Sequence, residues 1–197
     1  MKIWSKTRLD QKLKPVLIEK ADLLDVLEFP DERLRQKSQP VESIDENLEK
    51  LVYDMLNTMY LTNGIGLAAP QIGKLLNLVV MDISKEKNSP MVLINPQIIW
   101  RSKETKLQSE GCLSVKVSED LAKKLQDFSD KNEGGVLRSL EVKLKYQDLS
   151  MNEKEIHANK LFAHCIQHEL DHLKGTLYID LIEPISLKEE FLKFFDK

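Results

Sequence analysis

Residues 167–175, QHELDHLKG, decide how this chain is organised. Apolar residues recur at helical spacing before and within this stretch, and a glycine is a favoured helix stop, so we predict a helix that ends near Gly175. Residues four apart lie one above the other on a helix, so His168 and His172 can point their rings at one divalent metal ion. Glu169 directly follows the first histidine, where its carboxylate can take a proton from a water molecule beside the metal.

A catalytic metal site needs a third protein ligand, and several residues compete for this role. His164 lies about 12 Å along the helix from the second histidine, too far for one ion to bind both. The extended pattern HExxHxxGxxH fails at its last position, which is Tyr178. We favour Cys112, a soft ligand in a glycine-containing turn. A distal carboxylate, Glu189 or Glu190, stays open as the alternative and would indicate a zinc endopeptidase.

Length and composition limit the class of protein. The 197 residues suit one domain with a proper core. The net charge of −3, without a strongly basic block, argues against direct nucleic-acid binding. No apolar run approaches the roughly 20 residues that span a bilayer, so no membrane association is expected. Two cysteines with 52 residues between them favour a reducing compartment over a disulfide framework.

We divide the chain into an N-terminal extension, residues 1–24, and a catalytic domain, residues 25–197. The extension is basic but lacks the arginine and serine richness of an organellar transit peptide, so we favour a surface arm. Residues 116–135 are expected to be an insertion. It should contain a short helix that starts at Ser118 and a loop over residues 130–135.

The remaining periodicities predict an α+β domain. Residues 43–60 should form an amphipathic helix capped by Ser43, and Asn159 should cap the helix that carries the histidines. A short C-terminal helix is expected around Leu187 and Phe191. Strands are expected at residues 77–83, 91–95, 97–108, 136–146 and 153–158. We therefore predict a single domain in which mixed or antiparallel sheets pack around a central metal-binding helix.

The glycine-containing stretch 63–73, NGIGLAAPQIG, indicates a loop beside a ligand. It is not a phosphate-binding loop, because no strand precedes the glycines and no Lys-Ser/Thr pair follows them. Glycine permits positive φ and close approach of the backbone to a ligand. We expect a tight turn that lines a pocket, with Gln71 as a hydrogen-bond donor.

Three motifs together resemble the signature of the peptide deformylase family. They are GIGLAAPQ at 64–71, EGCLS at 110–114 and QHELDH at 167–172, in the family's order. The resemblance extends from about residue 25 to residue 183. It implies an α+β metallohydrolase that removes the formyl group from the N-terminal formyl-methionine of newly made polypeptides. The implied location is the bacterial cytoplasm, with an organelle as the alternative.

The resemblance also implies roles for individual residues. The implied metal ligands are Cys112, His168 and His172. The family's ion is usually Fe²⁺, which Zn²⁺, Ni²⁺ or Co²⁺ can replace. Glu169 would act as general base and then acid, while the Gln71 side chain and the Leu113 backbone N–H would stabilise charge on the formyl oxygen. The implied substrate contacts are Gly64, Ile65, Gly66, Glu110, Gly111, Leu161, His164 and Cys165.

The chain departs from the family pattern in two places. Segment 116–135 follows the cysteine motif where the family lines the entrance to the site, so it would act as a lid or reshape access. Gln108 and His164 stand where the family's methionine pocket is apolar. If they point inward, the preference for formyl-methionine is altered, and if they point outward, nothing changes.

The expected partners are N-formylmethionyl nascent peptides. A transient ribosome contact through the short C-terminal helix stays open. Two other functions also remain: a zinc endopeptidase of the HExxH type, and a deformylase-like protein with altered substrate or lost activity. The presence of every catalytic residue of the family argues against lost activity.

Overall fold

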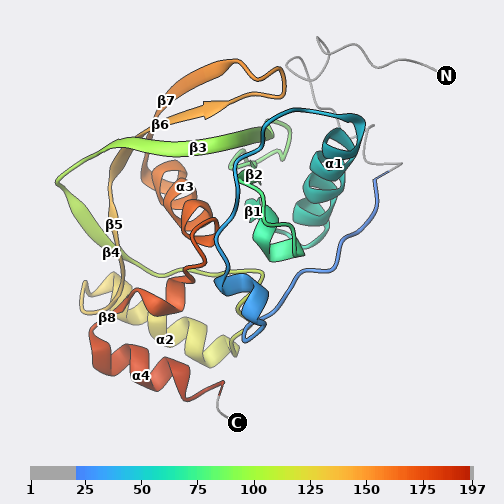
Figure 1. The fold of residues 1–197 in the computed structure, drawn as a ribbon. Helices are drawn as coiled ribbons and strands as arrows, with labels where there is room; N and C mark the ends of the chain where they lie inside the picture. Colours follow the sequence, from blue (N-terminus) through green and yellow to red (C-terminus); the bar gives the residue numbers. More distant parts are fainter. Residues whose placement is uncertain (1–20, 196–197) are drawn as a thin grey trace.

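The computed structural model describes residues 21–195, so nearly all of the predicted extension, residues 1–24, lies outside the described residues. Within residues 21–195, two antiparallel sheets pack with four α-helices, and α3 (Lys160–His172) lies between the layers (Figure 1). The predicted α+β architecture around the helix that carries HExxH is confirmed. None of the described helices is long and apolar enough to cross a membrane.

The larger sheet separates two helices. Its strands, in spatial order, are β1 (Gly66–Ala68), β2 (Leu78–Met81), β3 (Met91–Arg101), β6 (Glu141–Gln147) and β7 (Glu153–Asn159). Alternate strand residues point to opposite faces. In β2, Leu78 and Val80 therefore pack with α1 (Glu46–Leu61), whereas Val79 and Met81 pack with α3. Burial on both faces explains why this strand is a continuous apolar run.

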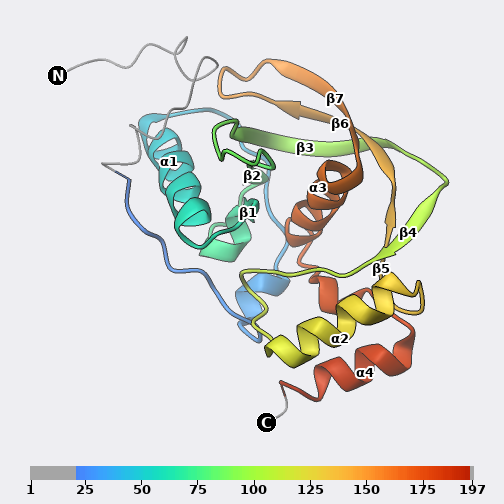
Figure 2. The same cartoon turned by 180° about the vertical axis from the view of Figure 1, so that it is seen from behind.

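The smaller sheet lies at the other end of the domain. Its strands, in spatial order, are β4 (Thr105–Gln108), β5 (Gly135–Ser139) and β8 (Ile182–Glu183). Helices α2 (Glu119–Asp130) and α4 (Ile185–Leu192) lie next to each other in both ribbon views (Figures 1 and 2), and Lys124 forms a salt bridge with Glu190 between them.

Two long predicted strands are wrong, because each divides between the two sheets. Residues 97–108 split into the end of β3 and β4, and residues 136–146 split into β5 and β6. Ser102 lies at the corner, where its hydroxyl accepts a hydrogen bond from the backbone N–H of Glu141 and donates one to the carbonyl of Glu104. These side-chain bonds replace strand pairing, so the chain can turn from one sheet into the other.

The helix caps match the prediction only in part. Ser118 caps α2, as predicted, by accepting a hydrogen bond from the backbone N–H of Leu121. The cap of α1 is Asp45 and not Ser43, since the Asp45 carboxylate accepts from the backbone N–H of Leu48 at 2.8 Å. Asn159 occupies the cap position of α3, but its side chain makes no capping bond.

Within residues 21–195, the chain also contains three short 3-10 turns, η3 (Glu32–Arg35), η4 (Ala69–Ile72) and η5 (Tyr178–Asp180). After α3, the backbone reverses at Gly175, where φ is +73°. A Cβ at this position would lie 2.3 Å from the backbone oxygen of Arg35. Both the dihedral angle and the close contact require glycine, which confirms the predicted end of the helix.

Candidate active site

The three stretches singled out in the sequence meet around one cavity of about 450 Å³. The first lies at the start of β1 and in η4, the second in the turn after β4, and the third on α3. The lining residues are Asn63, Gly64, Ile65, Gly66, Gln71, Ser109, Glu110, Gly111, Cys112, Leu113, Leu161, His164, Cys165, His168 and Glu169. Segments far apart in the sequence thus contribute to a single site.

Cys112, His168 and His172 form the group that could hold a metal ion. Their ligand atoms lie within 4.8 Å of one another, and the Cys112 Sγ atom is 3.2 Å from His172 Nε2. Burial, with the charge of His168 nearby, holds the pKa of His172 well below its usual range, so this imidazole is neutral and able to bind a metal. One sulfur and two imidazole nitrogens are a donor set that suits zinc or iron.

Glu110 orients the first histidine. The Nδ1 atom of His168 lies 2.6 Å from Glu110 Oε2, which leaves Nε2 for a metal. Burial would raise the pKa of Glu110, but hydrogen bonds from His164, His168 and Arg138 outweigh it and hold the pKa well below its usual range. Glu110 is therefore an ionised acceptor that orients His168, and because it also lines the cavity, its contact with substrate stays a prediction.

Arg138, on β5, is a residue that the sequence analysis missed. Its Nε donates to Glu110 Oε1 at 2.6 Å, and its Nη1 donates to Asp171 Oδ2 at 2.5 Å. Its side chain is only 7 % exposed. The guanidinium thus ties β5, the Cys112 turn and α3 together. No local pattern around Arg138 could have shown this, because all of its partners are distant in sequence.

Tyr178 also contributes unexpectedly. Its ring stacks on that of His168 with centroids 6.1 Å apart, and the ring of Phe191 of α4 packs edge-on against it with centroids 6.0 Å apart. Both aromatic side chains are buried. In the sequence, Tyr178 only excludes a longer metal-binding pattern, whereas in the structure its ring supports that of His168.

Glu169 sits at the inner wall of the cavity beside β1. An added Cβ at Gly66 would lie 2.3 Å from Glu169 Oε1, so the glycine is required by close approach and not by positive φ. Burial raises the pKa of Glu169 to about 7. A carboxyl with a pKa in this range can accept and return a proton near neutral pH.

Gln71 is held as a donor beside Cys112. Its Oε1 accepts a hydrogen bond from the backbone N–H of Ala68 at 2.8 Å, and its Nε2 donates to Ser114 Oγ at 3.2 Å and lies 3.6 Å from Cys112 Sγ. The backbone N–H of Leu27 donates to the backbone carbonyl of Gln71 at 2.7 Å. These contacts aim the amide N–H groups at the cysteine side of the cavity.

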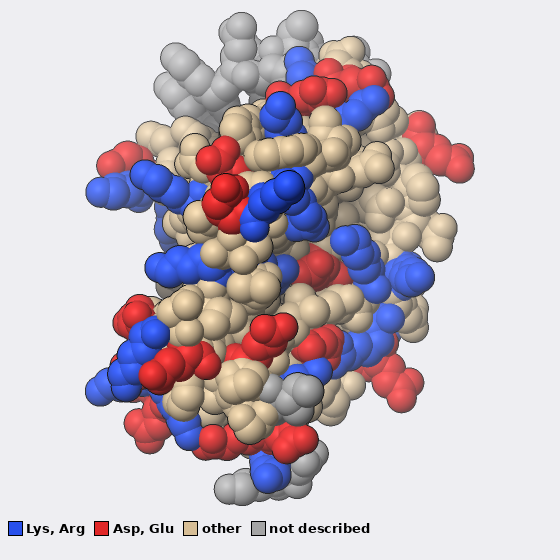
Figure 3. Space-filling view, turned by 90° about the vertical axis from the view of Figure 1, so that its left-hand side faces the viewer, with Lys and Arg blue, Asp and Glu red and all other residues tan. Residues whose placement is uncertain are grey.

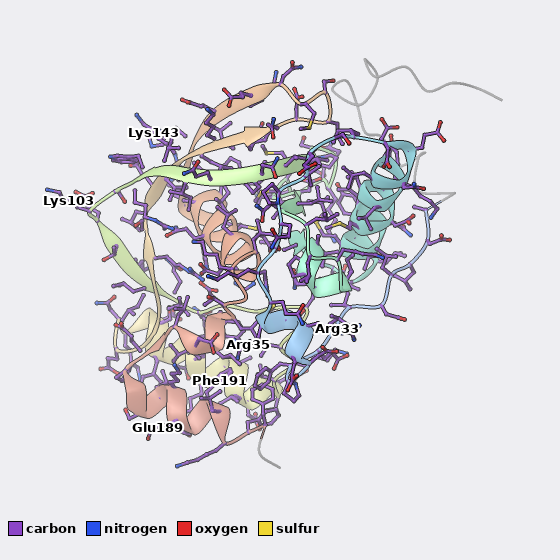
Figure 4. All side chains as sticks on the ribbon, in the orientation of Figure 1. Arg33, Arg35, Lys103, Lys143, Glu189 and Phe191 are labelled. Atoms are coloured by element: carbon purple, nitrogen blue, oxygen red, sulfur yellow. The ribbon has the colours of Figure 1, made fainter. Side chains whose placement is uncertain are left out.

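The remaining expectations are met unevenly. His164 lines the cavity, whereas Gln108 does not. The part of segment 116–135 that forms α2 packs on β4 and β5 instead of lining the cavity. Glu189 and Glu190 are exposed on α4, and Figure 4 shows Glu189 on the side of α4 away from α3. The alternative in which one of them completes the metal site is therefore wrong.

The profile of the polypeptide deformylase family matches residues 23–124 and 128–188. The chain belongs to the peptide deformylase family. A peptide deformylase from Chromohalobacter salexigens is 44% identical over 174 residues, which cover 88% of this chain and 94% of that protein. The chain is an enzyme of this family, which acts on formylmethionine-initiated peptides with a divalent metal ion.

Solved structures agree with this assignment. The crystal structure of a peptide deformylase from Legionella pneumophila has a TM-score of 0.72 and 36% identity and covers 88% of this chain and 94% of that one. A peptide deformylase from Synechococcus elongatus, solved in complex with actinonin, has a TM-score of 0.71 and 36% identity, with 86% and 84% covered. Similar deformylases therefore share the fold over most of its length.

Proposed function

We propose that Cys112, His168 and His172 bind the metal of the deformylation reaction and that Fe²⁺ is the native ion, replaceable by Zn²⁺, Ni²⁺ or Co²⁺. The observation that carries this proposal is the convergence of the thiol and two imidazoles at the inner end of the cavity. When bound, such an ion acts as a Lewis acid that lowers the pKa of water and polarises the formyl carbonyl.

Glu169 would move the proton. Its carboxylate accepts the proton of the attacking water and then returns it to the amine that leaves the formyl group. Its burial and its pKa of about 7 support this double role, because neither protonation state is strongly preferred near neutral pH. Gly66 lets the carboxylate stand directly against the strand that borders the substrate.

Gln71 and Leu113 would stabilise the charge that develops on the formyl oxygen. The Gln71 amide is already held by its contacts to Ala68 and Ser114, so it loses little freedom when the charge forms. Leu113 lies in the turn directly after Cys112 and lines the cavity. Donors of this kind are effective because they are oriented before the reaction starts.

The substrate backbone would add to the free edge of the larger sheet. Strand β1 is the edge strand, and residues 64–66 line the cavity immediately before and at its start. An extended peptide can pair with such an edge through its backbone. Since the Synechococcus elongatus enzyme was solved with actinonin, we propose that the same compound binds this cavity.

We further propose a cytoplasmic location in a bacterium, because relatives that are 43% and 44% identical to this chain are bacterial proteins. Nascent formylated peptides are then the natural partners, with transient contact to the ribosome. On the face drawn in Figure 3, Lys and Arg side chains are interspersed with Asp and Glu. The mixture of positive and negative side chains on this face supports the expectation that the enzyme does not bind nucleic acid directly.

The test is formate release from formyl-Met-Ala-Ser by protein loaded anaerobically with Fe²⁺ or Ni²⁺. Replacing the proposed base, Glu169→Ala, should lower kcat by about 10²- to 10⁴-fold while the metal stays bound one to one. Cys112→Ser should lose both the activity and the metal. Intact metal content in Cys112→Ser, or undiminished formate release in Glu169→Ala, would contradict the assigned roles.

A further inference from the structure

The first turn of α3 places a second polar ring in the cavity, and the proposed chemistry does not use it. His164 precedes His168 by one helical turn, about 6 Å along the axis. Its side chain is 17 % exposed and lines the cavity. Its cavity-lining neighbours Leu161, Cys165 and Ile65 offer mainly apolar surface. The separation of about 6 Å between His164 and His168 suits the side chain of the first substrate residue.

The contact with Glu110 determines how the His164 ring is presented. His164 Nε2 lies 2.9 Å from Glu110 Oε1, and both oxygens of that carboxylate also accept from the guanidinium of Arg138. A carboxylate paired with arginine is an acceptor, so His164 donates through Nε2–H. In the neutral ring, Nδ1 is then an acceptor. Among residues 21–195, none donates a hydrogen bond to it.

We propose that His164 determines which first side chain this enzyme accepts. The enzyme then accepts, besides formyl-methionine peptides, N-formyl peptides whose first side chain has the length of methionine and carries a neutral N–H donor. Glutamine is the probe for this class of side chain. This inference rests on the proposed deformylase function and deepens it.

The physical reason is an acceptor at Nδ1 of His164 beside the largely apolar surface of Ile65, Leu161 and Cys165. An apolar side chain packed over Nδ1 leaves this acceptor without a partner, which disfavours binding. The amide of glutamine restores a hydrogen bond there. Ser109 lines the same cavity, and its hydroxyl can donate to the carbonyl of the glutamine amide.

The experiment compares kcat/KM for formyl-Met-Ala-Ser and formyl-Gln-Ala-Ser in three metal-loaded proteins. His164→Leu removes the acceptor and should raise the preference for methionine over glutamine by about tenfold. His164→Gln is the matched control, because its amide can contact Glu110 and still present an acceptor. It should keep the wild-type preference, and metal content is measured in each protein.

A second comparison needs no variant. The wild-type protein is assayed with formyl-Gln-Ala-Ser and with the peptide that carries the methyl ketone analogue of glutamine, in which a methyl group replaces the amide NH2, so that the side chain has the same length but no N–H donor. We expect about tenfold higher kcat/KM for the glutamine peptide. Equal kcat/KM values for the two peptides, or the same methionine preference in all three proteins, would overturn the proposal. Formate release from formyl-Met-Ala-Ser would then still show that the deformylase function stands. If no formyl-methionine peptide is cleaved by metal-loaded protein, both the deformylase function and the proposal fail.

Discussion

The two ends of the cavity are built by different physical means, although one helix supplies both. At the metal end, around Cys112, His168 and Glu169, buried polar groups form a network that crosses four segments of the chain. At the pocket end, around Ile65, Leu161 and His164, apolar surface surrounds a single imidazole. The comparison shows that the reaction chemistry depends on polar and charged groups that come together from distant parts of the sequence. Substrate choice depends instead on a few residues of the cavity wall.

The largest effect is expected from Arg138→Leu, which breaks the network of the metal end. The change leaves the buried, ionised Glu110 and the partly buried Asp171 without their arginine, so the free energy of unfolding should fall by about 3–5 kcal/mol. Metal affinity should fall about 10- to 100-fold, because Glu110 no longer holds His168. Denaturant titration and metal competition measure the two effects.

Arg33→Leu is the matched control for this change. Arg33 pairs with Asp31 on the surface, and Figure 4 places it far from the centre of α3. Loss of such an exposed pair should leave stability and metal affinity unchanged. Equal losses in both variants would mean that the polar network at the metal end is no more important than an ordinary surface pair.

The next prediction concerns the pH dependence of metal-free protein. Burial raises the pKa of Glu169 from 4.5 to about 7, so ionising this carboxyl disfavours the folded state. The destabilisation begins above pH 4.5 and is complete above about pH 7. Glu169→Gln should therefore gain stability relative to wild type over this window, by up to about 3 kcal/mol. Denaturant titrations at pH 5 and pH 8 measure it, and a pH-independent difference would contradict the assigned burial effect.

Gly66→Ala should lower kcat by about 100-fold, because the added methyl group occupies the position of the Glu169 carboxylate. Metal content should be retained, since neither residue is a ligand. Gly111→Ala places a methyl group at another glycine of the cavity, where an added Cβ meets no atom within 4 Å, so only a loss of kcat beyond that of Gly111→Ala is assigned to the contact with Glu169. Steady-state assays of both variants decide whether the close approach at Gly66 matters, and equal kcat values would show that it does not.

The smallest effect is expected at the pocket end. Leu161 is 52% exposed at the cavity, so Leu161→Ala removes little buried surface. KM for formyl-Met-Ala-Ser should rise about threefold with kcat unchanged, as when a contact made equally with the bound substrate and the transition state is weakened. Leu61→Ala, at an exposed position outside the cavity lining, should change neither constant. A large fall in kcat in Leu161→Ala would show that the two ends are coupled.

Local patterns predicted the parts of the fold that depend on nearby residues. The helix that carries His168, its end at Gly175 and the Ser118 cap were all predicted correctly, because periodicity and turn chemistry act over a few positions. The Ser43 cap was wrong because Asp45 stands closer to the helix and makes the same bond. A choice between two suitable caps depends on backbone geometry, which the pattern does not contain.

Other errors came from long-range effects. The two long strands divide because a corner at Ser102 lets the chain enter a second sheet. Arg138 and Tyr178 were missed because their contacts with Glu110 and His168 join residues distant in sequence. These interactions carry no local periodicity.

By itself, the sequence determined the chemical groups of this enzyme and the helix that presents two of the three candidate metal ligands, because side-chain spacing on a helix is a local property. Only the tertiary structure shows that Cys112 lies beside His168 and His172, that Arg138 holds Glu110, and that His164 but not Gln108 lines the cavity. These outcomes depend on how two sheets and one helix pack together. Packing is decided by burial and pairing over the whole chain.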